Sequence, residues 1–98
     1  MKIPKEFNLF GHVIKVEYDK DLANKHQTVG FAVYRENKIQ LQAESKHITQ
    51  KTDVEQAFLH EAVHLILNQM GENELRDNEK FVDVLASLLH QMLVTAKY

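Results

Sequence analysis

The chain has 98 residues, a formal net charge of −2 at pH 7 and no cysteine. A chain of this length buries roughly 60–70% of its unfolded surface around one core, so we expect a single domain over residues 1–98. Hydrophobic residues make up 44% of the chain and charged residues 27%. This balance is typical of a globular protein and argues against a disordered chain or a membrane protein.

The charge and the composition also exclude several kinds of site. A small negative net charge argues against direct binding of nucleic acid. The absence of cysteine excludes disulfides, thiolate metal sites and cysteine nucleophiles. The sequence has neither a signal peptide nor a membrane span, so it predicts a cytoplasmic protein without a membrane partner.

The first half of the chain, residues 1–50, is predicted to be rich in strands. Hydrophobic and polar residues alternate over residues 14–18, which is the period of a half-buried strand. The same alternation recurs over residues 29–42 on both sides of a polar turn at 35–38, which predicts a hairpin. Residues 19–28 have no clear period and are expected to form a loop with some helical character.

The second half predicts two helices, over residues 51–71 and 76–96. Thr52 and Glu55 are spaced as a capping box, and Gly71 is a helix stop. Hydrophobic residues occur on nearly every side of the first helix, so we expect it to be buried. Strands followed by helices indicate an α+β fold, with a small antiparallel or mixed sheet of about three strands packed on an antiparallel pair of helices. The hydrophobic second helix is compatible with a dimer, but no residue pattern demands one.

His60, Glu61 and His64 form a His-Glu-x-x-His motif inside the first predicted helix, which is the context that this motif requires. Four residues are about one helical turn, so both imidazoles project from one face and fit two positions of a tetrahedral zinc. Glu61 lies about 100° around the helix from His60, where a general base would stand beside the metal. One alternative is chance spacing, which would leave these buried polar residues with a desolvation cost that a metal removes. The other is a metal-free network of buried carboxylates and histidines that is stable in its own right.

A catalytic zinc needs a third protein ligand. The short connection between the helices predicts antiparallel packing, which places Glu79 level with His64 and Asp83 level with His60. We therefore expect His60, His64 and Glu79 to bind the zinc. Asp83 is then placed to accept a hydrogen bond from the other ring nitrogen of a ligand histidine.

Other acidic residues and histidines are weaker candidates for the metal site. The same register places His90 beside Asp53, about 16 Å along the helix axis from Glu79, which makes His90 a poor ligand. Glu74 and Asp77 are alternative third ligands, and Asp83 could exchange roles with Glu79. The remaining histidines are expected to be solvated surface residues, namely His12, His26 and His47.

These motifs resemble those of a known group of enzymes. The His-Glu-x-x-His motif, followed by Asn-Glu-x-x-x-Asp at residues 78–83, is similar to the gluzincin-type zincin metallopeptidases, which include thermolysin. The hairpin at residues 30–41 and the helix at 58–64 resemble more closely the short bacterial and phage zincin-like proteins related to the ImmA/IrrE metallopeptidases. This likeness spans residues 7–95. The chain departs from thermolysin in a shorter link between the motifs and in lacking a second subdomain that would wall the cleft.

The resemblance implies a zinc-dependent metallopeptidase that hydrolyses a peptide bond in a protein or peptide. Zinc would lower the pKa of its bound water from about 15.7 towards about 7, and Glu61 would take the proton. Tyr34, His26 and Tyr98 are the candidate donors to the oxyanion, and residues 30–34 are the candidate edge for binding substrate as an added strand. The alternative is a catalytically silent zinc-binding module that recognises a protein partner, which the missing subdomain favours.

Overall fold

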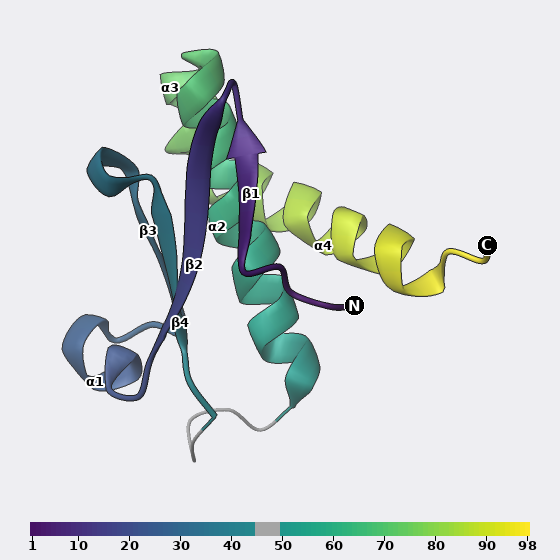
Figure 1. The fold of residues 1–98 in the computed structure, drawn as a ribbon. Helices are drawn as coiled ribbons and strands as arrows, with labels where there is room; N and C mark the ends of the chain where they lie inside the picture. The colour runs from purple at the N-terminus through teal and green to yellow at the C-terminus, as the bar shows by residue number, and fades with distance from the viewer. Residues whose placement is uncertain (45–49) are drawn as a thin grey trace.

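The structure, a computed structural model, describes residues 1–44 and 50–98. It confirms the α+β class, because a four-stranded mixed sheet packs on a layer of helices (Figure 1). The strand order is β1-β2-β4-β3, in which the central pair β2 and β4 is parallel and both outer pairs are antiparallel. The strands are β1 (Glu6–Leu9), β2 (His12–Asp19), β3 (Gly30–Val33) and β4 (Lys38–Gln42).

Strand β1 adds a fourth strand to the three that the sequence predicted. It forms a tight hairpin with β2, in which Leu9 pairs with His12. The two turn residues, Phe10 and Gly11, both have positive φ angles, of 48° and 78°. This is the backbone of the primed turns that match the twist of a hairpin, and glycine adopts it without strain. A strand of only four residues is too short for its alternation to stand out in the sequence.

The remaining part of the strand-rich half agrees with the prediction. Strands β3 and β4 form the expected hairpin around a 3-10 turn, Tyr34–Glu36, which ends at Asn37 with a φ of 52°. The segment predicted as a loop with helical character contains the short helix α1 (Leu22–His26). Leu22 is fully buried and anchors this helix to the body of the domain.

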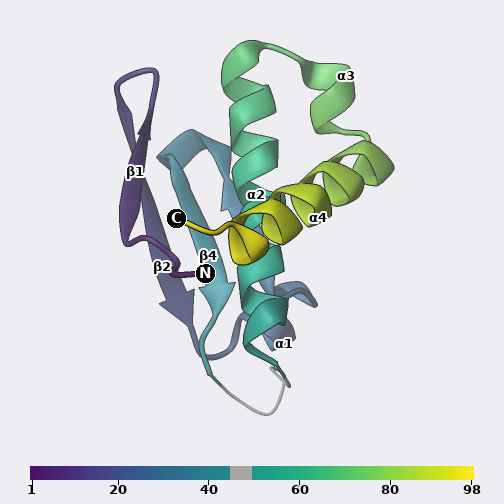
Figure 2. The ribbon, with the colours of Figure 1, turned by 90° about the vertical axis from the view of Figure 1, so that its right-hand side faces the viewer.

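Helix α2 (Lys51–Met70) lies between the sheet and helix α4 (Glu79–Thr95), as Figure 2 shows. Because one side of α2 packs on the sheet and another on α4, its hydrophobic residues are not confined to one stripe. The prediction that this helix is buried is therefore confirmed. The core consists of Ile14, Ile39 and Leu41 from the sheet, Phe58, Leu59, Ala62, Val63, Leu65 and Leu67 from α2, and Val82 and Ala86 from α4.

The capping box predicted at the start of α2 is wrong. The helix begins at Lys51 without a side-chain cap, and the Thr52 hydroxyl donates to the side chain of Gln50 at 3.3 Å. Glu55 is instead buried against α4, where its Oε1 lies 2.8 Å from His90 Nε2. A buried hydrogen bond to a charged group is worth more than an exposed cap, so the tertiary partner determines the position of this carboxylate.

The second predicted helix, residues 76–96, is divided in the structure. A short helix α3 (Asn73–Arg76) precedes α4, which begins only at Glu79. The predicted start is wrong because the side chain of Asn78 accepts a hydrogen bond from the Phe81 backbone N–H at 3.0 Å and caps α4. Glu79 is consequently the first residue of α4, at the end of the helix where the dipole favours a negative charge.

Helix α4 returns across α2 after the turn at Gly71, as predicted for an antiparallel pair, but it crosses α2 at a wide angle (Figures 1 and 2). The predicted register holds close to the turn, where Asp83 is level with His60. It fails further along, because His90 contacts Glu55 and not Asp53. Two helices that diverge from a straight antiparallel arrangement lose a constant register within a few turns.

The Glu55–His90 pair leads to a prediction about stability. Hydrogen bonding by His90, together with the Met1 amino group at 3.2 Å, holds the pKa of Glu55 below its usual value of 4.5. The stabilisation is therefore complete above pH 4.5 and is lost as the pH falls through the folded-state pKa. Glu55→Gln should lower the free energy of unfolding by about 1 kcal/mol near neutral pH and by much less at an acidic pH below the folded-state pKa of Glu55.

Urea unfolding of the two proteins at both pH values measures this difference. Glu72→Gln is the matched control, since Glu72 is exposed and should show no loss. An equal loss in Glu55→Gln at both pH values would contradict an ionic contribution from Glu55.

Candidate metal centre

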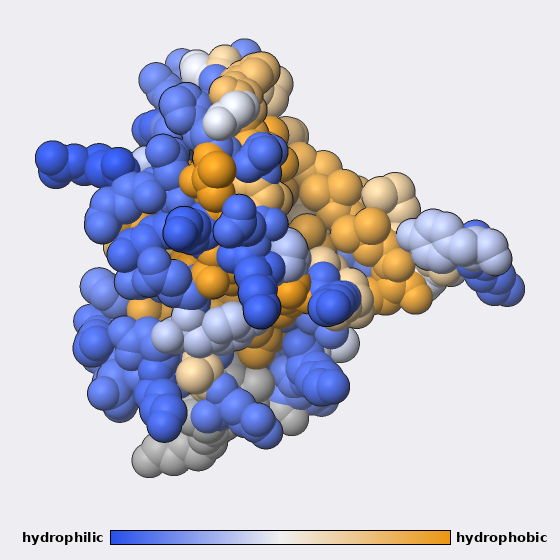
Figure 3. All heavy atoms as spheres, viewed as in Figure 1, coloured by the Kyte–Doolittle hydropathy of each residue, from blue (hydrophilic) through white to orange (hydrophobic). Residues whose placement is uncertain are grey.

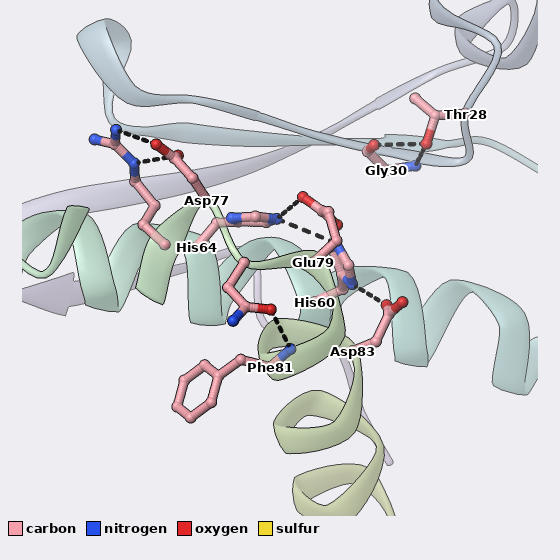
Figure 4. Close-up of polar contacts among 10 residues, drawn as sticks. Thr28, Gly30, His60, His64, Asp77, Glu79, Phe81 and Asp83 are labelled. Atoms are coloured by element: carbon pink, nitrogen blue, oxygen red, sulfur yellow. Dashed lines mark hydrogen bonds and ion pairs between the residues drawn. The ribbon is translucent and has the colours of Figure 1, made fainter. Parts of the chain in front are cut away.

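Three ligand atoms converge where the middle of α2 meets the first turn of α4 (Figure 4). The Nε2 atoms of His60 and His64 lie 3.2 Å apart. The Glu79 carboxylate approaches both nitrogens, with Oε2 at 3.2 Å from His60 Nε2 and Oε1 at 3.2 Å from His64 Nε2. Neighbouring ligands of a tetrahedral zinc, bound at about 2.05 Å, stand about 3.3 Å apart. The three side chains are thus close enough together for one atom of each to bind the same metal ion.

The backbone explains why these side chains meet. His60 and His64 are one turn apart on α2, so their rings project from the same face. Glu79 reaches them from α4 because the Asn78 cap starts the helix at this residue. The histidines are largely buried, whereas the Glu79 side chain is 66% exposed and closes the cluster on the solvent side.

Asp83 lies one turn after Glu79 and contacts the other nitrogen of His60. Its Oδ1 is 2.7 Å from His60 Nδ1. A carboxylate at this distance accepts the Nδ1–H and therefore leaves the lone pair of a neutral imidazole on Nε2, the atom that points into the cluster. The structure thus brings together four of the residues that the sequence singled out, in the relative positions expected.

His64 lacks such support. Its Nδ1 atom is buried, and within the described part of the chain the group nearest to partnering the ring on this side is the backbone of Arg76, which raises the pKa of His64 without a well-formed hydrogen bond. Burial lowers the pKa of His64 and favours the neutral ring, and the Glu79 carboxylate opposes this effect. A neutral ring is the form that binds a metal. Acceptor atoms of His60, His64 and Glu79 therefore face one another at short distances, an arrangement that a cation stabilises.

Glu61 lies beside the cluster and is not part of it. Its side chain is buried, and burial raises its pKa to about 7, with Glu79 adding to the rise and His60 opposing it. A cavity of about 250 Å³ adjoins this carboxylate and is lined also by His60, Asp83 and Gly30. The structure therefore places a carboxyl group of near-neutral pKa next to an accessible hollow.

Gly30 allows the close approach of β3 to α2 at this point. A Cβ atom on Gly30 would lie 3.1 Å from the Cβ of Ala57 and 3.2 Å from the Cγ of Glu61. These distances are shorter than ordinary carbon contacts, so a larger residue would push β3 away from the helix. Gly30 therefore fixes the position of Glu61 as well as that of the strand.

Strand β3 is an edge of the sheet, as expected for residues 30–34, and runs past this position. The Gln42 N–H donates to the Val29 carbonyl at 2.9 Å, so the alternation of an antiparallel ladder directs the backbone groups of Gly30 and Ala32 away from β4. The Thr28 hydroxyl donates to the Gly30 carbonyl at 2.9 Å (Figure 4). The backbone of Ala32 faces Glu61, whose pKa it lowers.

The three candidate oxyanion donors lie in different places. Tyr34 follows β3, and its pKa is raised by burial and further by the carboxylates of Glu61 and Glu79, while Arg76 opposes the rise. His26 stacks on Phe31 at 4.6 Å, and Tyr98 lies in the exposed C-terminal residues. The structure thus places Tyr34 within electrostatic reach of the cluster.

Arg76 was not predicted to belong to this region. Its Nη1 donates to Asn68 Oδ1 at 2.7 Å, its Nε donates to Asp77 at 3.0 Å, and its guanidinium lies 5.4 Å from the centre of the Tyr34 ring. Arg76 therefore joins α2, the segment before α4 and the end of β3. Asn68 follows His64 by four residues and so lies on the same face of α2 as the two histidines, a spacing that was visible in the sequence.

The alternative ligands lie apart from the cluster. Asp77 pairs with Arg76, and His90 pairs with Glu55. Glu74 is an exposed residue of α3, and His12 is exposed at the start of β2. His47 lies outside the described residues.

Comparison with models of protein families, with curated proteins and with solved structures found no match to this chain. Within residues 1–44 and 50–98, no helix is both long enough and apolar enough to cross a bilayer. The function must therefore be inferred from the chemistry of the site.

The close approach at Gly30 can be tested by a double-mutant cycle. Gly30→Ala should lower the free energy of unfolding by about 1–3 kcal/mol, because the added methyl group overpacks the contact with Ala57. In the background of Ala57→Gly, which removes the opposing Cβ, the same substitution should cost less. Urea unfolding of the four proteins gives the coupling energy, and strictly additive losses would show that the two residues are not in contact.

Proposed function

We propose that this protein is a zinc-dependent metallopeptidase in which His60, His64 and Glu79 bind the metal. The observation that carries the proposal is the convergence of ligand atoms: His60 Nε2 and His64 Nε2 lie 3.2 Å apart, and each lies 3.2 Å from a different oxygen of the Glu79 carboxylate. Imidazole and carboxylate donors in tetrahedral array suit zinc, and catalytic zinc sites keep the fourth position open. The bound ion would polarise the substrate carbonyl and activate a water.

Glu61 is the general base in this proposal. A base works best when its pKa is close to the working pH, and burial raises the pKa of this carboxyl to about 7. A Cβ atom at position 30 would lie 3.2 Å from the Glu61 Cγ, so Gly30 leaves the room that this side chain occupies. Glu61 would accept a proton from the attacking water and would pass it to the leaving amine.

The remaining residues orient the reactants. Asp83 fixes the ring of His60 through Nδ1, so that its Nε2 is free to bind the metal. Tyr34 donates a hydrogen bond to the oxyanion, with Arg76 holding its ring. The substrate is a protein or peptide that would lie along the edge strand β3, where it would have to displace Thr28 from Gly30 and Glu61 from Ala32 before pairing with their backbone groups.

A second candidate function is a catalytically silent zinc-binding module that recognises a protein partner. The observation that favours it is the exposure of Glu79 and Asp83, whose side chains are largely in solvent. Peptidase sites commonly shield the reacting groups from bulk solvent. No element of the described chain covers this side of the cluster.

Metal content tests the site. Protein purified without added metal or chelator should contain about one zinc per chain by elemental mass spectrometry, as a site with three ligands predicts. Glu79→Ala should lose most of this zinc, while Glu74→Ala, which changes an exposed glutamate of α3, should keep it. A wild-type protein that stays metal-free after zinc is offered and the excess removed would exclude the centre.

Activity tests the role of Glu61. Glu61→Gln should lower the rate of peptide hydrolysis by about 10²–10⁴-fold and leave zinc content unchanged, because the base is lost and the ligands are not. The assay uses a pool of unstructured peptides, with cleavage read by mass spectrometry. Zinc-loaded wild type without any cleavage would favour the silent module, and equal cleavage by Glu61→Gln would rule out Glu61 as the base.

A further inference from the structure

The two histidines of the candidate metal centre are supported unequally on the side away from the cluster. Asp83 Oδ1 lies 2.7 Å from Nδ1 of His60 and accepts its N–H. The Nδ1 atom of His64 is buried, and no group within the described residues forms a hydrogen bond with it. A neutral histidine that binds zinc through Nε2 carries its proton on Nδ1, and this N–H requires an acceptor.

The backbone of Arg76 is the group best placed to supply the missing acceptor. It raises the pKa of His64, and a backbone group has this effect when it accepts a proton from the ring, which identifies the Arg76 carbonyl. In Figure 4 the ring of His64 lies between Glu79 and Asp77. The side of the ring away from Glu79 therefore faces the segment that joins α3 to α4.

Asn68 ties this segment to α2. Nη1 of Arg76 donates to Asn68 Oδ1 at 2.7 Å, while Nε and Nη2 of the same guanidinium donate to the Asp77 carboxylate. Asn68 lies four residues after His64 and so on the same face of α2. Leu75, the one hydrophobic residue of α3, packs against the core. The directional contact between α2 and this segment therefore comes from the bond between Asn68 and Arg76.

We infer that Asn68 is a positioning residue for the proposed metal centre. By holding the side chain of Arg76, it keeps the Arg76 carbonyl where it accepts the Nδ1–H of His64 once Nε2 binds the ion. His64 thereby receives the support that Asp83 gives to His60. This role rests on the proposed function, because it requires His64 to bind zinc, but it does not require catalysis.

Zinc affinity is a more specific readout of this role than the rate of peptide hydrolysis. The Arg76 guanidinium also lies 5.4 Å from the centre of the Tyr34 ring, which is the oxyanion donor in the proposed function. A change at Asn68 would reach both His64 and Tyr34, and a catalytic rate would not separate the two effects. Tyr34 is not a ligand, so a change in zinc affinity reports on the ligand side.

Substitutions at Asn68 test the role. Asn68→Leu keeps the approximate size of the side chain but removes the acceptor for Arg76, so it should weaken zinc binding about tenfold, the lower end of the range for losing an outer contact of a ligand histidine. Asn68→Asp keeps an oxygen for Arg76 and should bind zinc at least as tightly as wild type. Asn73→Leu is the matched control, since it makes the same substitution at an exposed position of α3 and should leave the affinity unchanged. Competition with a chromogenic chelator of known affinity gives each dissociation constant.

The titrations are made with the full chain at low micromolar concentration. Helix α4 presents an almost continuous hydrophobic surface (Figure 3), and patches of this kind promote association. Light scattering and circular dichroism check that each variant has the mass and the helix content of wild type. If Asn68→Leu does not fold, Asn68→Ala replaces it, because alanine is the residue best tolerated in a helix.

Proton exchange separates positioning from a general loss of stability. In zinc-loaded protein with isotope-labelled histidine, the Nδ1–H protons of His60 and His64 should both exchange slowly with water, because each has an acceptor. Asn68→Leu should speed exchange at His64 and leave His60 unchanged, since Asp83 still supports that ring. A variant that only loosened the domain would speed exchange at both.

Three results would overturn the role of Asn68. They are an unchanged zinc affinity in Asn68→Leu, an equal loss in Asn68→Leu and Asn68→Asp, and faster exchange at both histidines. Zinc-loaded protein that shows these effects but cleaves no peptide would reject the proposed catalysis and support the positioning role. A wild-type chain that binds no zinc would overturn both.

Discussion

The central constraint on this structure is that α2 is covered on two sides, by the sheet and by α4. A helix in this position cannot hide its polar residues by turning them outward, so each one needs a partner. His60 finds Asp83 and Glu79, and Glu55 finds His90. All three partners come from α4, which is why that helix combines a hydrophobic core with carboxylates at its start and a histidine near its end.

Much of the fold follows from patterns that are local in the sequence. The alternation over residues 29–42 predicted the hairpin, and the hydrophobic residues on all sides of residues 51–71 predicted a buried helix. The fourth strand was missed, since four residues give too little periodicity, and its position depends on the turn at Phe10 and Gly11. Local pattern thus predicts elements well when they are long and poorly when tertiary pairing holds them.

The candidate site shows the same limit. The spacing of His60 and His64 needs only helical geometry, and Glu79 and Asp83 needed only a short connection to be placed level with them. The close packing of Gly30 on α2 and the contacts of Arg76 could not be found in this way, because they depend on which segments approach from far along the chain. The capping box failed for a related reason, since Glu55 had a better partner on another helix.

The placement of Glu79 at the very start of α4 has a mechanical consequence. His60 and His64 lie on α2 and Glu79 lies on α4, so the distances between these three side chains depend on how the two helices pack against each other. The hydrophobic contacts of Val82 and Ala86 hold α4 against α2, about one to two helical turns after Glu79. A small rotation of α4 about these contacts would move Glu79 away from the two histidines. A substitution in the core that touches none of the three residues would then lower the affinity of the proposed site for a cation.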